Sequence, residues 1–321
     1  MKIRIGRQHS ALGETRWRKF SRWVGLSRGR SRGNRLSTAA LLIAVTITCS
    51  GSSGARDIGS PEEQYGEIPF GLYNGNLIVV KATVGSVKNV NLILDTGTSA
   101  TAINQVMADR LNLWGKSISL QTLNGTIQVE SVTLPRIQIG PLHADSIRGV
   151  VEDLSFLERS LGISLGGIAG LDILRSASFA IDYRRQKIIF GPIAPSEKAV
   201  HFETQIPYLS VKAKIAGQEV RLLVDSGTAG LLVYRNRFGA AVEQFHIDPH
   251  ASISTPAGGG TRVRWLSAEV SLENSNLGTR NVAIVDVDAG PQDDFDGLFG
   301  LATMGFRRVS FDFENGLFGW E

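Results

Sequence analysis

The residues best suited to chemistry are two aspartates, Asp95 and Asp225, each of which follows an apolar run. Each aspartate opens the same turn, Asp-Thr/Ser-Gly-Thr, so one short phrase occurs twice in the chain. An apolar strand carries its terminal carboxylate to a buried position, where an unpaired charge is expensive. Two copies therefore predict that the side chains meet and share one proton. The charged acid would then activate a water molecule while the protonated acid polarises a carbonyl group.

The residues that follow the aspartates fit this chemistry. Gly97 and Gly227 have no Cβ, so backbone and partner groups can approach them closely. Thr98 and Thr228 carry hydroxyls that can donate hydrogen bonds to a carboxylate and favour its charged form. One Asp-Thr-Gly turn is an ordinary loop, so the prediction depends on the second copy.

Two further pairs of landmarks are separated by the same interval as Asp95 and Asp225. Gly170 and Gly300 each end an apolar pair, and Asp182 and Asp312 each follow an apolar strand pattern. Repetition at a fixed interval indicates an internal duplication. Each half is about the usual size of a domain.

Strand patterns dominate the elements that must position these residues. In the first half we expect strands at 77–84, 90–94, 118–123, 126–134, 136–140, 179–183 and 187–190. In the second half we expect them at 211–215, 220–224, 261–272, 280–287, 309–313 and 317–320. Two short helices are predicted, at 104–111 and 153–161, each opened by an Asn or Asp cap. The predicted fold class is all-β with few short helices.

These patterns divide the chain into five segments. They are a basic leader with an apolar segment and tether at 1–54, a linker at 55–67, an N-terminal lobe at 68–191, a second linker at 192–205, and a C-terminal lobe at 206–321.

Charge is segregated along the chain. Residues 1–50 carry eleven Lys or Arg and one acid, whereas the remaining residues carry 23 basic and 29 acidic side chains. The folded part is mildly acidic, so the basic overall charge does not indicate nucleic-acid binding.

Residues 36–48 form an uncharged apolar run directly before Cys49. Thirteen residues are fewer than the roughly 20 that a membrane span needs, and the run suits the core of a secretory signal. Three outcomes fit it: lipidation of Cys49 as in a bacterial lipoprotein, cleavage after the run, or retention as a short N-terminal anchor. We expect an exported protein that is periplasmic or attached to a membrane through its N-terminus.

Other chemistries have weaker support. One cysteine cannot form an intrachain disulfide, and no Cys/His cluster has zinc spacing, so we expect no metal site. Residues 162–166 match the G-x-S-x-G nucleophile elbow. That elbow needs a strand before it and a helix after it, whereas the preceding residues look helical.

The chain resembles the aspartic peptidases, in particular the retropepsin-like aspartyl proteases of bacteria. The resemblance covers residues 65–321 and depends on the two aspartate turns and on the apolar-apolar-Gly triplets that end at Gly170 and Gly300. It implies a two-lobed acid-protease fold built from duplicated retropepsin-like β-barrel units, with a cleft between the lobes. No cofactor is implied, and two fused halves make a monomer sufficient.

The resemblance also implies roles for individual residues. Asp95 and Asp225 would be catalytic, Thr96 and Ser226 would join the lobes through crossed hydrogen bonds, and Thr98 and Thr228 would bond the outer carboxylate oxygens. Gly170 and Gly300 would belong to ψ-shaped crossings that brace the active-site loops. Flaps over the substrate would include Thr122, Asn124 and Gly125 in the first half, and Gly258 and Gly259 in the second. The first flap region lacks the Tyr of pepsins, so the resemblance is closer to two fused retropepsin units.

These features predict an aspartic endopeptidase that hydrolyses peptide bonds and works best at mildly acidic pH. Its partner would be a peptide or protein substrate in an extended conformation, paired with the flaps through main-chain hydrogen bonds. The alternative is an exported, non-catalytic peptide-binding or scaffold protein that kept the fold. Intact aspartates and glycines in both turns favour the enzyme.

Overall fold

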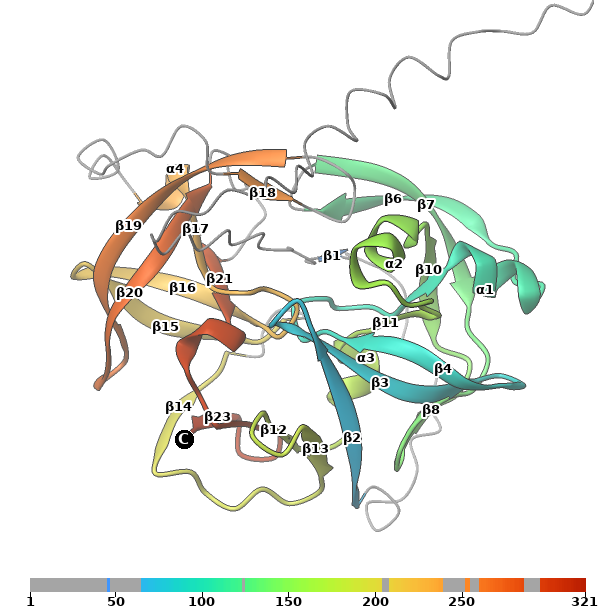
Figure 1. Ribbon diagram of the computed structural model, residues 1–321, viewed down its shortest axis with the longest axis horizontal. Helices are drawn as coiled ribbons and strands as arrows, with labels where there is room; N and C mark the ends of the chain where they lie inside the picture. Colours follow the sequence, from blue (N-terminus) through green and yellow to red (C-terminus); the bar gives the residue numbers. More distant parts are fainter. Residues whose placement is uncertain are drawn as a thin grey trace, which may run out of the picture. The chain divides into compact units, whose positions relative to one another are not determined.

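A computed structural model describes residues 45–46, 65–122, 125–203, 208–238, 252–254, 260–285 and 295–321. All of them lie in one compact unit, Ala39–Glu321. This unit is mostly β, with a closed six-strand barrel and a second sheet, as in a two-lobed all-β protease fold (Figure 1). The predicted fold class is therefore confirmed.

The first lobe contains most of the larger sheet. Its strands are β2 (Gly66–Tyr73), β3 (Leu77–Val84), β4 (Val87–Leu94), β5 (Ala102–Asn104), β6 (Lys116–Thr122), β7 (Gly125–Thr133), β8 (Ile137–Ile139), β9 (Leu142–Ala144), β10 (Arg148–Glu152), β11 (Gly167–Ala169), β12 (Phe179–Asp182) and β13 (Lys187–Phe190). Its helices are α1 (Gln105–Arg110), α2 (Ser155–Leu161) and α3 (Leu171–Leu174). A two-residue strand, β1 (Val45–Thr46), pairs with β6.

The second lobe repeats this plan. Its elements are β14 (Lys198–His201), β15 (Ser210–Ile215), β16 (Gln218–Asp225), β17 (Leu231–Tyr234), α4 (Arg235–Phe238), β18 (Ser252–Ser254), β19 (Gly260–Leu272), β20 (Ser275–Val285), β21 (Gly297–Gly300), η3 (Ala302–Met304), β22 (Arg308–Asp312) and β23 (Leu317–Trp320). Strands β15, β16, β21, β17, β20 and β19 pair in that order, and β19 returns to β15, which closes the barrel.

The two lobes differ where the first contains a proline. In the second lobe β19 runs for 13 residues and pairs with both β20 and β15. In the first lobe the corresponding segment is divided into β7, which pairs with β10, and β8, which pairs with β3. Pro135 lies in the gap between β7 and β8. Proline has no N–H to give to a strand ladder, so the break falls there.

One six-strand array joins the lobes, in the order β2-β13-β12-β22-β23-β14. At its centre β12 and β22 pair antiparallel, with Phe179 opposite Phe311 and Ile181 opposite Val309. The repeat interval that separates Asp95 from Asp225 also relates Phe179 to Val309 and Ile181 to Phe311. Exchanging the two lobes therefore turns the Phe179–Phe311 pair into the Ile181–Val309 pair. The register of this central pair therefore has the pseudo-twofold symmetry that the duplication predicts.

The duplication extends to single hydrogen bonds. The Gly166 N–H donates to the Asn91 carbonyl oxygen at 2.8 Å, and the Asp296 N–H donates to the Arg221 carbonyl oxygen at 2.7 Å. The repeat interval separates the two donors, and it also separates the two acceptors. Each bond holds the chain entering β11 or β21 beside the strand that ends at an aspartate.

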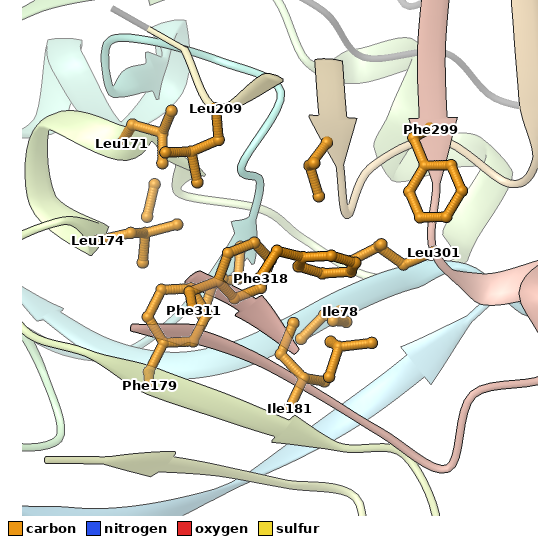
Figure 2. Close-up of a cluster of buried hydrophobic side chains, with 14 of the residues drawn as sticks. Ile78, Leu171, Leu174, Phe179, Ile181, Leu209, Phe299, Leu301, Phe311 and Phe318 are labelled. Atoms are coloured by element: carbon orange, nitrogen blue, oxygen red, sulfur yellow. The ribbon is translucent and has the colours of Figure 1, made fainter. Parts of the chain in front are cut away.

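A shared aromatic core lies against the central strands (Figure 2). The rings of Phe179 and Phe311 stack with centroids 4.8 Å apart, and Phe318 contacts Phe311 at 5.5 Å. All three side chains are fully buried. Leu171 from the first lobe and Phe299 from the second lie in the same cluster. Both lobes therefore contribute to one core.

Two segments expected as linkers contain strand residues. The segment expected as a linker at 192–205 contains β14, whose only buried side chain is Val200. An edge strand that buries one residue gives no alternating apolar pattern, so the sequence did not reveal it. The linker expected at 55–67 likewise runs into β2 at Gly66. Cys49 and most of the leader lie outside the described residues.

The G-x-S-x-G match has the wrong surroundings for a nucleophile elbow. Gly162 ends helix α2 in a left-handed conformation, with φ at 69°, and β11 follows at Gly167. The order is helix and then strand, the reverse of what the elbow requires.

In the part of the chain that the structure describes, no helix is long and apolar enough to cross a membrane.

Candidate active site

The two aspartates end equivalent strands. Asp95 follows β4, which pairs in parallel with β11, and Asp225 ends β16, which pairs in parallel with β21. The apolar residues directly before each aspartate in these strands are fully buried. The strands thus carry both carboxyls inside, and both aspartates have no exposed surface.

The turns after the aspartates are tied together by four crossed hydrogen bonds. The Thr96 N–H donates to Ser226 Oγ and the Ser226 N–H donates to Thr96 Oγ1, each at 3.0 Å. The Thr96 hydroxyl donates to the Val224 carbonyl oxygen at 2.9 Å, and the Ser226 hydroxyl donates to that of Leu94 at 3.0 Å. Each hydroxyl accepts one bond and donates another across the lobes. Ser226 stands where the first turn has Thr96, and its hydroxyl forms the same two kinds of bond as the Thr96 hydroxyl.

Close packing of the glycines brings the two carboxyls to one place. A Cβ added at Gly97 would lie 2.4 Å from Asp225 Cγ, and one added at Gly227 would lie 2.7 Å from Asp95 Oδ2. Both distances are far shorter than van der Waals contact. Each turn therefore needs glycine because the other aspartate lies against it.

The two carboxyls have different hydrogen bonds. Asp225 Oδ1 accepts the N–H of Gly227 at 2.7 Å and that of Thr228 at 3.0 Å, and its Oδ2 accepts the Thr228 hydroxyl at 2.6 Å. Asp95 Oδ1 accepts the Gly97 N–H at 2.8 Å. Its Oδ2 is buried and has no hydrogen-bond partner among the described residues. Donors to an acid favour its charged form, so this arrangement favours charge on Asp225.

The hydroxyls of Thr98 and Thr228 do not have the same role. The expected bond to the carboxylate is present at Thr228, whereas the Thr98 hydroxyl donates to the Ala100 carbonyl oxygen at 3.1 Å. A hydroxyl has one hydrogen to donate. The expectation that Thr98 donates its hydroxyl to Asp95 is therefore corrected.

Both aspartates have raised pKa values. Burial, followed by the charge of Asp225, raises the pKa of Asp95 well above its ordinary value. Burial raises the pKa of Asp225 to about 6, and the Thr228 hydroxyl opposes this increase most. Two acids so close cannot both ionise cheaply. The pair therefore keeps a proton at a pH where separate carboxyls would have lost theirs.

The apolar-apolar-Gly triplets lie directly behind the turns. A Cβ at Gly170 would be 2.8 Å from the carbonyl carbon of Ala100, and one at Gly300 would be 2.4 Å from the Thr228 carbonyl oxygen. Because β11 and β21 each pass between two strands of their own lobe, these glycines let the chain cross behind each aspartate turn.

The expected flaps are only partly within the described residues. Thr122 and Gly125 pair at the ends of β6 and β7, which form a hairpin. Asn124 lies outside the described residues, as do Gly258 and Gly259. In the second lobe β18 and β19 form the corresponding hairpin.

Two polar groups at the site were missed by sequence reasoning. Asp172 accepts the N–H and the hydroxyl of Thr101 at 2.9 and 2.7 Å, which braces the first turn from behind. Asn76, on the β2–β3 turn, donates from Nδ2 to the Gly227 carbonyl oxygen at 2.8 Å. Asp172 stands two residues after Gly170, which was a usable signal. Asn76 has no motif around it.

No metal-binding geometry is present among the described residues, since no three His, Cys, Asp or Glu side chains gather there. The donors around the aspartates are backbone N–H groups and hydroxyls, which suit carboxyl groups and a water molecule.

The two β lobes, each with an aspartate turn, have the fold of two-lobed all-β proteases. A family described as gag-polyprotein putative aspartyl protease matches residues 80–175. The match supports the retropepsin-like aspartic peptidase family that the sequence resembles. The matched residues begin within β3, end directly after α3, and include the Asp95 turn and Gly170. A search among curated proteins found no match.

Proposed function

We propose that this protein is an aspartic endopeptidase in which Asp95 and Asp225 act together on a water molecule. One observation carries the proposal: each buried carboxyl lies against the glycine of the other turn, with crossed hydrogen bonds holding the turns together. The family match in the first lobe supports a protease in general.

The hydrogen bonds support different roles for the two acids in this proposal. Asp225, with three donors, is the charged acid that removes a proton from water. Asp95 is the protonated acid, because its Oδ2 has no donor among the described residues and burial beside Asp225 raises its pKa. It polarises the scissile carbonyl. The water oxygen then adds to the carbonyl carbon, and the tetrahedral intermediate collapses as the amine leaves with a proton.

A peptide would lie extended across the two turns and beneath the β6–β7 and β18–β19 hairpins. Main-chain pairing with hairpin strands would hold it regardless of most side chains. The proposal includes export, with the protein either periplasmic or attached to a membrane through its N-terminus.

The test is cleavage of a peptide library in water enriched in oxygen-18, with the wild-type chain and Asp225→Asn. We expect the wild-type chain to cut internal peptide bonds and to place one labelled oxygen in each new carboxyl group. Asp225→Asn should show no cleavage above background. A wild-type chain that binds peptides but never cuts them would instead support the non-catalytic alternative.

A further inference from the structure

Asn76 presents a buried hydrogen-bond acceptor beside the two aspartates. It lies on the turn between β2 and β3, and its side chain is 1% exposed. Its Nδ2 donates to the Gly227 carbonyl oxygen, so a first-lobe side chain holds the turn of Asp225. The orientation of the amide is fixed by chemistry, because only the NH₂ group can face a carbonyl oxygen.

The other end of this amide has no partner. Asn76 Oδ1 is buried and accepts no hydrogen bond from any described residue. A buried amide oxygen without a hydrogen-bond donor destabilises the folded state. Such a group in a native structure needs an explanation, and one explanation is a donor that arrives with a ligand.

The location identifies the ligand group. Gly227 is two residues from Asp225 and lies against Asp95 Oδ2. Asn76 therefore contacts Gly227, and Gly227 contacts the acids between which the scissile bond must lie. The group that an extended peptide presents at regular intervals is its backbone N–H, which is a donor only.

We propose that Asn76 Oδ1 accepts a backbone N–H of the bound peptide beside the Asp225 turn, and so sets the position of the scissile bond. This inference rests on the proposed function, because it places the peptide over the aspartate turns. Asn76 is a positioning residue: it fixes Gly227 with one end of its amide and the substrate with the other.

The test combines substitutions in the protein with N-methylation of the substrate. A peptide that the full chain cleaves is methylated at one backbone nitrogen at a time, which removes one donor. Each version is assayed with the wild-type chain, Asn76→Ala and the control Asn74→Gly. Asn74 lies in the same turn, is exposed, and has a φ of 50°, which glycine tolerates.

We expect one methylation to lower kcat/KM about 10-fold in the wild-type chain and in Asn74→Gly, which corresponds to one hydrogen bond. The same methylation should cost less than about 2-fold in Asn76→Ala, because the acceptor is already gone. If every methylation costs the same factor in all three proteins, Asn76 only pins Gly227 and the inference is wrong.

A second measurement does not need a folded variant. In a crystal structure of the wild-type chain with a reduced-bond peptide, a peptide nitrogen should lie within hydrogen-bond distance of Asn76 Oδ1. A water molecule there, or no donor, would overturn the inference while leaving the peptidase proposal intact. Should the wild-type chain cleave nothing, the same methylation series is measured as peptide Kd.

Discussion

At the scale of single residues, the two aspartates have the same position but unequal surroundings. The sequence predicted the duplicated turns and the approach of the two acids. It could not predict the inequality, because Thr98 and Thr228 are the same residue type at equivalent positions, yet their hydroxyls donate to different acceptors. Hydroxyl direction depends on the local backbone, which a motif does not specify.

Asp95→Asn should stabilise the protein at neutral pH while strongly lowering its activity. A raised pKa means that the folded state binds a proton that the unfolded state has lost. The resulting stability is complete below the unfolded pKa near 4 and is lost as the pH rises through the folded pKa. Asparagine imitates the protonated acid at every pH. Urea unfolding at pH 7.5 should show the variant more stable by on the order of 1 kcal/mol.

The control for this prediction is Asp225→Asn. It replaces the acid that accepts three hydrogen bonds, so it should gain less stability than Asp95→Asn at pH 7.5. At pH 4 both variants should approach the wild-type stability. Equal effects of the two substitutions at pH 7.5 would contradict the assignment of the proton to Asp95.

The rate of cleavage should depend on pH as a bell. Activity requires one proton on the pair, so it should rise as Asp225 ionises at about pH 6 and fall when Asp95 ionises at higher pH. The acid limb would then lie well above 3.8, where an ordinary aspartate ionises. Measuring kcat/KM from pH 3 to 9 checks this. A flat profile between pH 4 and 8 would speak against a shared proton.

At the scale of elements, several strands with one buried face were well predicted, whereas several short strands and the eight-residue strand β2 were not. The pattern for 77–84 coincides with β3, and that for 261–272 differs from β19 by one residue. The three-residue strands β5 and β11 were not predicted from the sequence, because hydrophobic periodicity can be recognised only over a longer run of residues. Their position comes from ladders with β4 and β10, which are tertiary contacts.

The crossed hydrogen bonds between the aspartate turns should contribute more to the free energy of unfolding than their number suggests. Thr96→Val keeps the side-chain shape but removes the hydroxyl that pairs with the Ser226 N–H and the Val224 carbonyl oxygen in a buried site. We expect a loss of about 2–4 kcal/mol. The matched change Thr96→Ser keeps the hydroxyl and should cost about 1 kcal/mol. Similar unfolding free energies for the two variants would show that these bonds contribute little.

At the scale of the whole molecule, duplication explains both the fold and the site. The array β2-β13-β12-β22-β23-β14 joins the lobes at a pseudo-symmetric pair of strands, and the aspartate turns lie on symmetry-related strands. The constant interval between repeated landmarks allowed this arrangement to be predicted. The closing of the second barrel and the break at Pro135 could not be, because pairing partners depend on long-range geometry.

Because both lobes share one core, a change in either should destabilise the whole unit. Phe179→Ala should cost about 3–5 kcal/mol, and Phe311→Ala a similar amount. The rings stack on each other, so the double variant should lose less than the sum. Denaturant unfolding followed by tryptophan fluorescence and by far-UV circular dichroism should give one shared transition. Two separate transitions would mean that the lobes unfold independently.

The most direct test of the central claim is the cleavage rate of a peptide by Asp95→Asn, Asp225→Asn and the double variant. If the two acids work as one unit, each single substitution should lower kcat/KM by about 10²–10⁴-fold, and the double should lower it little further. Substantial turnover by either single variant, or losses that simply multiply in the double variant, would contradict a catalytic pair.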